Sequence, residues 1–271
     1  MSTTSPAPRT VLVHYHLFKN AGTSIERLLR DAFGEAWASW DKSEPGARIS
    51  GADMQEWIEH RPGIRAVSSH QLVPPVPRGN FRVVPIVFLR DPLLRVRSAW
   101  RFEWQKQLGL NEPKGSLVEY IEAKFVHRHS SVIANFQVSR LGNLDYHGGR
   151  PRLHRYNEML LPAACRFIDS LPFVGLVDRF AESLELLQEA CREPFPGFEV
   201  REYRENVLEV TEESIASRHE RLRKDVGNEL FDELCLRNRL DLQLYGYAEG
   251  RFGATLERLR EGRPAELGRA A

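Results

Sequence analysis

The stretch TVLVHYHLFKNAGTSIERLL, residues 10–29, decides the fold of this chain. Its apolar run Val11–Val13 predicts a β-strand, and the spacing of Ile25, Leu28 and Leu29 predicts a helix shortly after it. The loop between them contains a glycine and two hydroxyl side chains. In this arrangement unpaired amide N–H groups and the positive end of the helix dipole face the loop, which predicts a cradle for a phosphate-like group.

This loop differs from the nucleotide-triphosphatase loop, whose pattern G-x-x-x-x-G-K-[ST] places a lysine after the second glycine. Here Lys19 precedes Gly22, and no glycine lies four or five residues upstream. We therefore expect a loop that binds a phosphate-like group but does not belong to an ATPase.

Length and composition predict one compact enzyme domain: 271 residues, 42% of them hydrophobic and 28% charged. The net charge of +1 argues against a nucleic-acid partner, and no apolar run approaches the ~18 residues of a membrane span. Three cysteines without a C-x-x-C motif predict reduced thiols in a cytoplasm. We expect a disordered tail over residues 1–9, a single domain over 10–249 and a polar helix or tail over 250–271.

Short apolar runs alternate with helical patterns along the chain. This order predicts an α/β fold with a central parallel sheet flanked by helices and with ligands at the carboxyl ends of its strands. The expected strands are Thr10–Tyr15, Ile64–Ser69, Val83–Leu89 and Phe173–Leu176. The expected helices are Ser24–Phe33, Met54–His60, Pro92–Gln107, Leu117–Lys124, Asn157–Leu161, Arg179–Cys191, Thr211–Leu222 and Val226–Leu244. Residues 41–51 and 72–80 are expected to be surface connections.

A second segment, VVPIVFLRDPLLRVRSAW at residues 83–100, runs from an apolar strand into a helix that begins near Pro92. The fork of Arg90 and the hydroxyl of Ser98 suit a second, separate phosphate group. The alternative is structural: Arg90 and Asp91 would cap the helix, and the arginines at positions 95 and 97 would be solvated.

Together, the two segments resemble the sulfotransferase family that includes heparan sulfate 2-O-sulfotransferases and bacterial carbohydrate sulfotransferases. HLFKNAGTS (16–24) is similar to the family pattern H-I-P-K-T-[AG]-G-T-S, and RDPLLRVRSAW (90–100) to R-D-P-x-x-R-x-x-S-x-[YFW]. FVGLVDRFAESLELL (173–187) and DLQLYGYA (241–248) are similar to two later segments of the family, in the same order. The resemblance implies a P-loop-like sulfotransferase fold.

The resemblance also implies an activity: transfer of the sulfuryl group of 3′-phosphoadenosine 5′-phosphosulfate to a hydroxyl of a carbohydrate, glycolipid or other small acceptor, with no metal ion. The donor has two separated anionic ends, which matches two phosphate sites. Arg90 and Ser98 would hold the 3′-phosphate, and Lys19 would stabilise the departing phosphate. The residues expected around the 5′-phosphosulfate are Lys19, Asn20, Ala21, Gly22, Thr23 and Ser24.

His70, after the strand expected at 64–69, is the candidate general base, because a histidine after this strand has that role in the family. The alternative is a histidine that only hydrogen-bonds a loop. Ser68 replaces the first histidine of the family's pair. NFQVSRLG (135–142) resembles the family's N-x-Q-x-x-R-L-x-G stretch, so its polar side chains are candidates for acceptor binding or for a structural helix cap. They are Asn135, Gln137 and Arg140.

Three further sequence features bear on the predicted donor site and on metal binding. Phe18 stands where the family usually has proline, which predicts a looser approach to the loop. His14 and His16 alternate along one strand, so both are expected on the same face, with His16 bracing the loop. The H-x-H formed by residues 127 and 129 has no evident cluster of acidic or cysteine partners, so no metal site is predicted.

Two other functions fit parts of the pattern. A P-loop kinase acting on a small molecule would require ATP and Mg²⁺, and the position of Lys19 argues against it. A non-catalytic nucleotide-binding protein of the same fold would bind the donor and transfer nothing. The presence together of Lys19, His70, Arg90 and Ser98 disfavours this second alternative.

Overall fold

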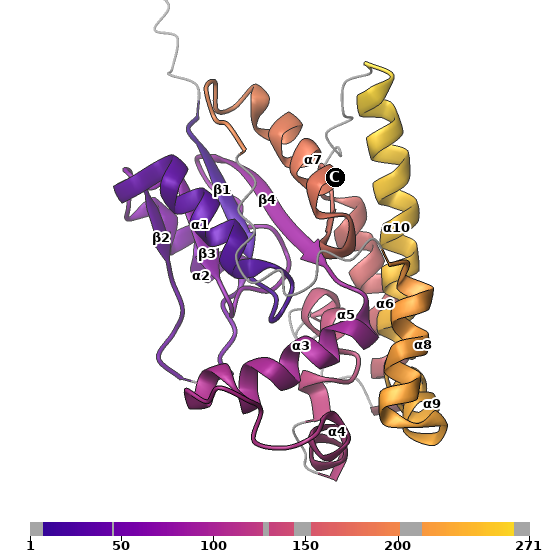
Figure 1. Cartoon of the computed structure of the whole chain (residues 1–271). Coiled ribbons are helices and arrows are strands. Elements are labelled where there is room, and N and C mark those ends of the chain that lie inside the picture. The colour runs from indigo at the N-terminus through magenta and orange to yellow at the C-terminus, as the bar shows by residue number, and fades with distance from the viewer. Residues whose placement is uncertain (1–7, 45, 127–129, 144–152, 201–212, 263–271) are drawn as a thin grey trace, which may run out of the picture.

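The computed structural model describes residues 8–44, 46–126, 130–143, 153–200 and 213–262. A five-stranded sheet lies at its centre, and its strands pair in parallel in the order β2-β3-β1-β4-β5. Helices flank this sheet, as Figure 1 shows. The predicted α/β fold with a central parallel sheet is therefore confirmed. The strands are β1 (Thr10–Tyr15), β2 (Trp37–Ser39), β3 (Ala66–Ser69), β4 (Arg82–Leu89) and β5 (Gly175–Leu176).

The α-helices of the described residues are α1 (Gly22–Phe33), α2 (Gly51–Glu59), α3 (Pro92–Trp104), α4 (Leu117–Val126), α5 (Phe136–Gly142), α6 (Leu153–Asp169), α7 (Phe180–Arg192), α8 (Ile215–Val226), α9 (Asn228–Arg237) and α10 (Arg239–Arg260). Short 3-10 helices are η1 (Gly34–Ala36), η2 (Lys106–Leu108), η3 (Ser130–Val132) and η5 (Val177–Arg179). None of the helices within the described ranges has both the length and the apolar character needed to cross a bilayer.

β1 and β4 pair at the middle of the sheet, and both strands are covered on both faces. All six residues of β1 are buried, as are the last six of β4. A parallel strand that is covered on both faces reads as a continuous apolar run, which is why the sequence identified these two strands. Their register runs from Thr10 opposite Arg82 to Tyr15 opposite Val87.

The order of the strands creates a switch point between β1 and β4. After β1, the chain builds β2 and β3 on one side of it; β4 then returns to its other side, and β5 extends the sheet beyond β4. In open parallel sheets, ligands bind outside the carboxyl ends of the strands at such a point. The segments that follow β1 and β4 are the two that the sequence predicted to bind phosphate.

Several elements differ from the sequence-based prediction, among them α5, which was not predicted, and the three that follow. β2 was not predicted, because three residues are too short for a recognisable pattern. The helix predicted over 226–244 is two helices separated at Asn238, whose Nδ2 donates to the carbonyl oxygens of Ile133 and Leu234. α6 extends well beyond the predicted 157–161 on both sides and contains Pro162, a residue that in a sequence usually marks a helix end.

The two ends of the predicted domain contain ordered contacts. Arg9, the last residue of the predicted tail, donates through its guanidinium to the main-chain oxygens of Ile58, Arg61, Pro62 and Ile64. α10 continues past the predicted boundary at residue 250 to Arg260, and its Phe252 and Leu256 are buried.

Candidate functional site

Four neighbouring strands end in polar residues at one edge of the sheet. Asp41 follows β2, His70 follows β3, the loop with Lys19 follows β1, and Arg90 follows β4. Because parallel strands point the same way, these segments meet at the same edge. The sequence had predicted His70, Lys19 and Arg90 for the site. It did not predict Asp41, which lies in a segment expected to be only a surface connection.

The loop after β1 has a constrained backbone. Lys19 and Ala21 adopt left-handed conformations, with φ of 65° and 60°. This conformation costs a residue with a Cβ about 1–2 kcal/mol, so contacts elsewhere must hold the loop. Asn20 supplies two of them: its Nδ2 donates to the Phe88 carbonyl oxygen at 2.8 Å and to Gln137 Oε1 at 2.7 Å. The buried Asn20 side chain, predicted to contact the donor, is thus directed into the protein.

Gly22 begins α1 and leaves room for the imidazole of His16. A Cβ on Gly22 would lie 1.8 Å from His16 Nε2 and 1.9 Å from its Cδ2. His16 therefore packs directly against the first turn of α1, in agreement with its predicted bracing of the loop. In the same turn Thr23 is exposed and Ser24 is buried. The first amide N–H groups of the helix point out of its end towards the loop.

Lys19 lies among aromatic rings and other cations. Its Nζ is 4.5 Å from the centre of the Phe102 ring, and Phe18 packs edge-on against Phe102 at 5.5 Å. Phe18, which stands where the family usually has proline, is thus packed against a ring of α3. Burial, together with the nearby charges of Arg90 and Lys106, lowers the pKa of Lys19 to about 8. An anion bound here would reverse that effect by favouring the ammonium form.

Arg90 lies directly beside the loop. Its Nη1 donates to the Lys19 carbonyl oxygen at 3.4 Å. Gln137 holds the Arg90 backbone on both sides: its Oε1 accepts from the Arg90 amide at 3.0 Å, and its Nε2 donates to the Arg90 carbonyl oxygen at 2.9 Å. Because Gln137 Oε1 also accepts from Asn20, one buried side chain joins both predicted phosphate segments.

α5, which carries Gln137, is held by α10. Asp241 accepts hydrogen bonds from the amides of Gln137 and Val138, at 3.0 and 2.7 Å. In return, Asn135 Oδ1 accepts from the amides of Leu240 and Asp241. Of the two possibilities that the sequence left open for Asn135 and Gln137, these contacts favour the structural one.

The start of α3 follows the predicted capping pattern. The carboxylate of Asp91 accepts from the amides of Leu93 and Leu94, and Pro92 occupies the first turn. The suggestion that Arg95 would be solvated is wrong, because this side chain is fully buried and its Nη2 donates to the Val132 carbonyl oxygen at 2.8 Å.

The suggestion that Arg97 would simply be solvated is also wrong, because Arg97 forms an ion pair with Asp225 of α8. Ser98 is half-buried on the second turn of α3. It precedes Phe102 by four residues and so shares the helix face of the ring that Lys19 contacts.

His70 forms a dyad with Asp41. His70 Nδ1 lies 2.8 Å from Asp41 Oδ2, and the same carboxylate accepts from the Ser69 hydroxyl and the His70 amide. Although burial opposes its charge, these hydrogen bonds lower the pKa of Asp41 to about 2. The hydrogen bond to Asp41 raises the pKa of His70, against a smaller lowering by burial. The His70 side chain is 49% exposed, so its ring is accessible to a substrate.

Arg140 contacts this dyad from α5. Its Nη2 donates to the His70 carbonyl oxygen at 2.5 Å. Burial, with Arg48 nearby, lowers the pKa of Arg140 to about 10. Of the three residues predicted to bind the acceptor, Arg140 is therefore the one that lies beside the candidate base.

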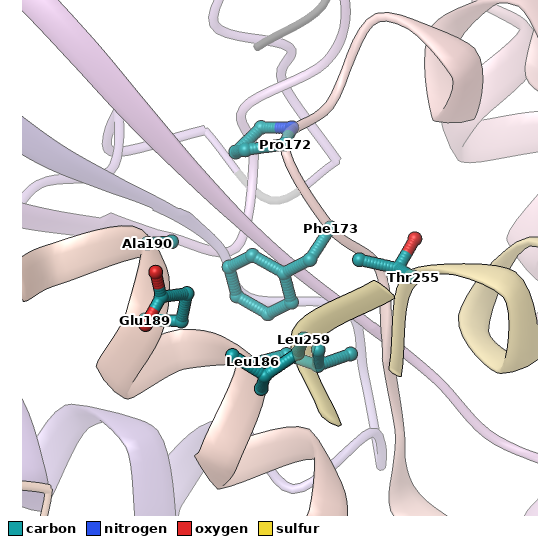
Figure 2. Close-up of a pocket in the computed structure, with 7 residues that line it drawn as sticks. All are labelled: Pro172, Phe173, Leu186, Glu189, Ala190, Thr255 and Leu259. Carbon is teal, nitrogen blue, oxygen red and sulfur yellow. The ribbon is translucent and has the colours of Figure 1, made fainter. Parts of the chain in front are cut away.

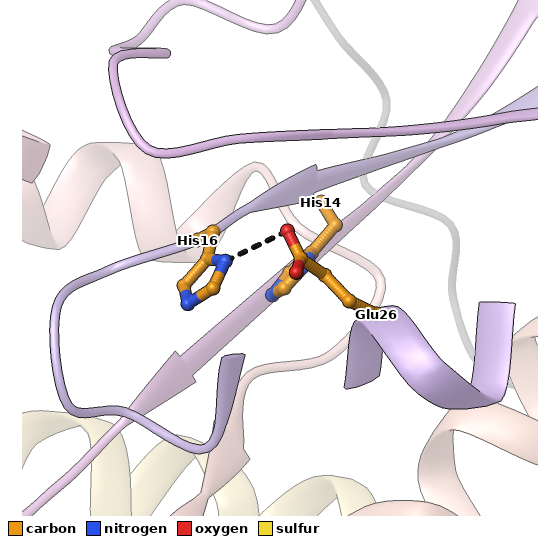
Figure 3. Close-up of side chains that lie close together, drawn as sticks. All are labelled: His14, His16 and Glu26. Atoms are coloured by element: carbon orange, nitrogen blue, oxygen red, sulfur yellow. Dashed lines mark hydrogen bonds and ion pairs between the residues drawn. The ribbon is translucent and has the colours of Figure 1, made fainter. Parts of the chain in front are cut away.

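Three histidine rings stand in a row beside the loop. His14 and His16 are stacked with their ring centres 5.3 Å apart, and His16 and His70 at 3.9 Å, which confirms that the first two share a face. Glu26 of α1 lies against them, with Oε1 2.9 Å from His16 Nδ1 (Figure 3). Burial lowers the pKa of His14 well below its usual value and also lowers that of His16. The H-x-H at residues 127 and 129 lies outside the described residues.

A small pocket between α7 and α10 lies away from all of these residues (Figure 2). Its apolar lining includes Phe173, Leu186 and Leu259. It contains none of the residues that the sequence assigned to the site.

Comparison with known proteins identifies a relative but no activity. No protein-family model matches the chain. An uncharacterized protein of Archaeoglobus fulgidus is 28% identical to it over 248 residues, which cover 88% of this chain and 95% of the archaeal one. The chain is thus similar along nearly its whole length to an archaeal protein whose name states no function.

Proposed function

We propose that this protein is a sulfotransferase that uses 3′-phosphoadenosine 5′-phosphosulfate and modifies a hydroxyl of a carbohydrate, glycolipid or other small acceptor. The proposal includes a P-loop-like sulfotransferase fold and a cytoplasmic location. The resemblance of four sequence segments to such enzymes supports the fold, and three free thiols are consistent with the location.

One observation carries the proposal: a candidate base and two cationic segments lie together at one edge of the sheet. His70 stacks on His16 at the start of the loop, and Arg90 donates to the main chain of Lys19. Transfer of a sulfuryl group from an anionic donor to a hydroxyl requires three kinds of group: a base, an anion-binding loop and an arginine that holds the donor.

The charges around the loop suit a bisphosphate donor. Besides burial, the charges of Arg90 and Lys106 lie close enough to Lys19 to lower its pKa. Lys19, Asn20, Ala21, Gly22, Thr23 and Ser24 would surround the 5′ end of the donor, largely through their main chain, and Arg90 and Ser98 would hold its 3′ end. When bound, the donor supplies the sulfuryl group and a phosphate leaving group.

His70 is set up to accept the acceptor's proton. Its Nδ1 faces Asp41, and a proton on Nδ1 leaves the lone pair of Nε2 for the incoming hydroxyl. Asp41 stays ionised at neutral pH and holds the ring in this tautomer and orientation. Lys19, as an ammonium ion, would stabilise the negative charge that develops on the departing phosphate.

Calorimetric titration with 3′-phosphoadenosine 5′-phosphate, adenosine 5′-phosphate and ATP–Mg²⁺ tests the donor site. We expect the bisphosphate to bind most tightly and Arg90→Ala to lose this preference. Arg97→Ala is the matched control, because Arg97 lies on α3 but pairs with Asp225. A preference for ATP–Mg²⁺ in the wild-type protein would replace the proposal with the kinase alternative.

Turnover tests the chemistry once an acceptor has been found by screening. Lys19→Ala and His70→Ala should abolish transfer while the melting temperature stays close to that of the wild type. Donor binding with no transfer to any acceptor, and no effect of His70→Ala, would support the non-catalytic alternative.

A further inference from the structure

His14, His16 and Glu26 form a compact group outside the proposed transfer reaction. The two imidazoles come from the end of β1 and the residue after it, and the carboxylate comes from the second turn of α1. One ligand atom from each residue lies within 4.8 Å of the other two. Figure 3 shows both rings and the carboxylate turned towards the same small volume.

We propose that this group is a binding site for Zn²⁺ or a closely similar transition-metal ion. Two imidazole nitrogens and one carboxylate oxygen form a His₂Glu set, which zinc accepts readily and which leaves one position for water. Mg²⁺ and Ca²⁺ prefer oxygen ligands, so the same group should discriminate against both.

The ligand atoms must approach one another by no more than about 1.5 Å to bind such an ion. At Zn–N and Zn–O distances near 2.0–2.2 Å and a tetrahedral angle, two ligand atoms lie about 3.3–3.6 Å apart. His16 Nδ1 and Glu26 Oε1 are 2.9 Å apart and would separate by a few tenths of an ångström. His14 would close the remaining distance, which is within 4.8 Å.

The surroundings favour ligands in the right protonation state. Both rings are largely buried, and burial favours the neutral imidazole that a metal ion requires. Ser68 Oγ lies 3.2 Å from His14 Nδ1 and can accept a hydrogen bond from a proton on Nδ1, which leaves the lone pair on Nε2. The absence of a side chain on Gly22 gives the His16 ring its place against α1.

Binding of the metal ion would displace a proton from the group. If His16 Nδ1 carries the proton that bridges it to Glu26, the metal ion takes that position and the proton leaves to solvent. A calorimetric experiment in two buffers with different ionisation enthalpies measures this release. Metal binding at this group does not require the proposed sulfotransferase activity, so either proposal can fail alone.

The test is titration of the metal-free protein with Zn²⁺, and separately with Mg²⁺. We expect one Zn²⁺ per chain, one proton released, and no measurable Mg²⁺ binding. Glu26→Gln and His14→Asn should each weaken Zn²⁺ binding at least about tenfold. His60→Gln is the matched control, because His60 is an exposed histidine at the end of α2.

A second measurement covers the case in which the buried variants fail to fold. Co²⁺ in the wild-type protein should give the intense visible absorption of a four- or five-coordinate ion, and Zn²⁺ should displace it. Weak octahedral absorption would overturn the proposal. So would Zn²⁺ binding that Glu26→Gln leaves unchanged, or that His60→Gln removes.

Discussion

Gly22→Ala is the substitution for which the structure makes its sharpest prediction. The new Cβ would lie 1.8 Å from His16 Nε2, where ordinary contact begins near 3.4 Å. The imidazole cannot move away cheaply, because it stacks on His70 at 3.9 Å and its Nδ1 is bonded to Glu26 at 2.9 Å. One methyl group should therefore disturb the loop, the histidine row and the candidate base together.

The cost follows from the contacts that must change. Forcing extra volume into a packed site costs about 1–3 kcal/mol. Losing the His16–Glu26 hydrogen bond, which involves a charged group, adds about 1.5–3 kcal/mol. With some relaxation, we expect a loss of about 2–5 kcal/mol, or roughly 5–20 °C in melting temperature for a domain of this size.

Thermal melting of four proteins isolates the cause: wild type, Gly22→Ala, His16→Ala and the double variant. If the imidazole is the obstacle, Gly22→Ala should cost little or nothing in the His16→Ala background. Gly246→Ala is the matched control, since that glycine is exposed in α10 with no atom near a new Cβ, and alanine should stabilise it by about 0.5–1 kcal/mol. An equal cost of Gly22→Ala in both backgrounds would refute the packing described above.

Two further predictions concern the proposed reaction. Because burial and neighbouring cations lower the pKa of Lys19 to about 8, the ammonium form predominates below that pH, and affinity for 3′-phosphoadenosine 5′-phosphate should fall as the pH rises through and above 8. Lys19→Arg should retain its charge and flatten this dependence in calorimetry from pH 7 to about 10, whereas the same decline in both proteins would place the titrating group elsewhere. Asp41→Asn removes the carboxylate that orients His70, so kcat should fall about 10²–10⁴-fold while bisphosphate affinity stays within about twofold, as measured by initial rates and calorimetry. An unchanged kcat in Asp41→Asn would exclude the dyad from catalysis.

Local sequence patterns predicted much of the framework. β1 was predicted with its observed bounds, and Asp91 with Pro92 marked the start of α3. These features depend on near neighbours in the chain: burial of a continuous apolar run, and a side chain that caps its own helix. The break at Asn238 was missed because its cause is contact with residues about a hundred positions away.

The sequence by itself determined that the chain would form a parallel α/β sheet with a glycine-containing loop after its first strand. It also supplied Lys19, His70 and Arg90, since each directly follows a recognisable strand or lies in the loop. Periodicity and turn chemistry act over a few residues, so one sequence is enough to show them.

Only the tertiary structure decided which of these residues meet, and through which partners. Asp41 became the partner of His70 because β2 pairs with β3, and Gln137 joined Asn20 to Arg90 from α5. Glu26 lies beside His14 and His16 because Gly22, which has no side chain, lets α1 pack closely against the end of β1. Such contacts join residues from 10 to more than 100 positions apart, and strand pairing and packing bring them together where no local pattern records them.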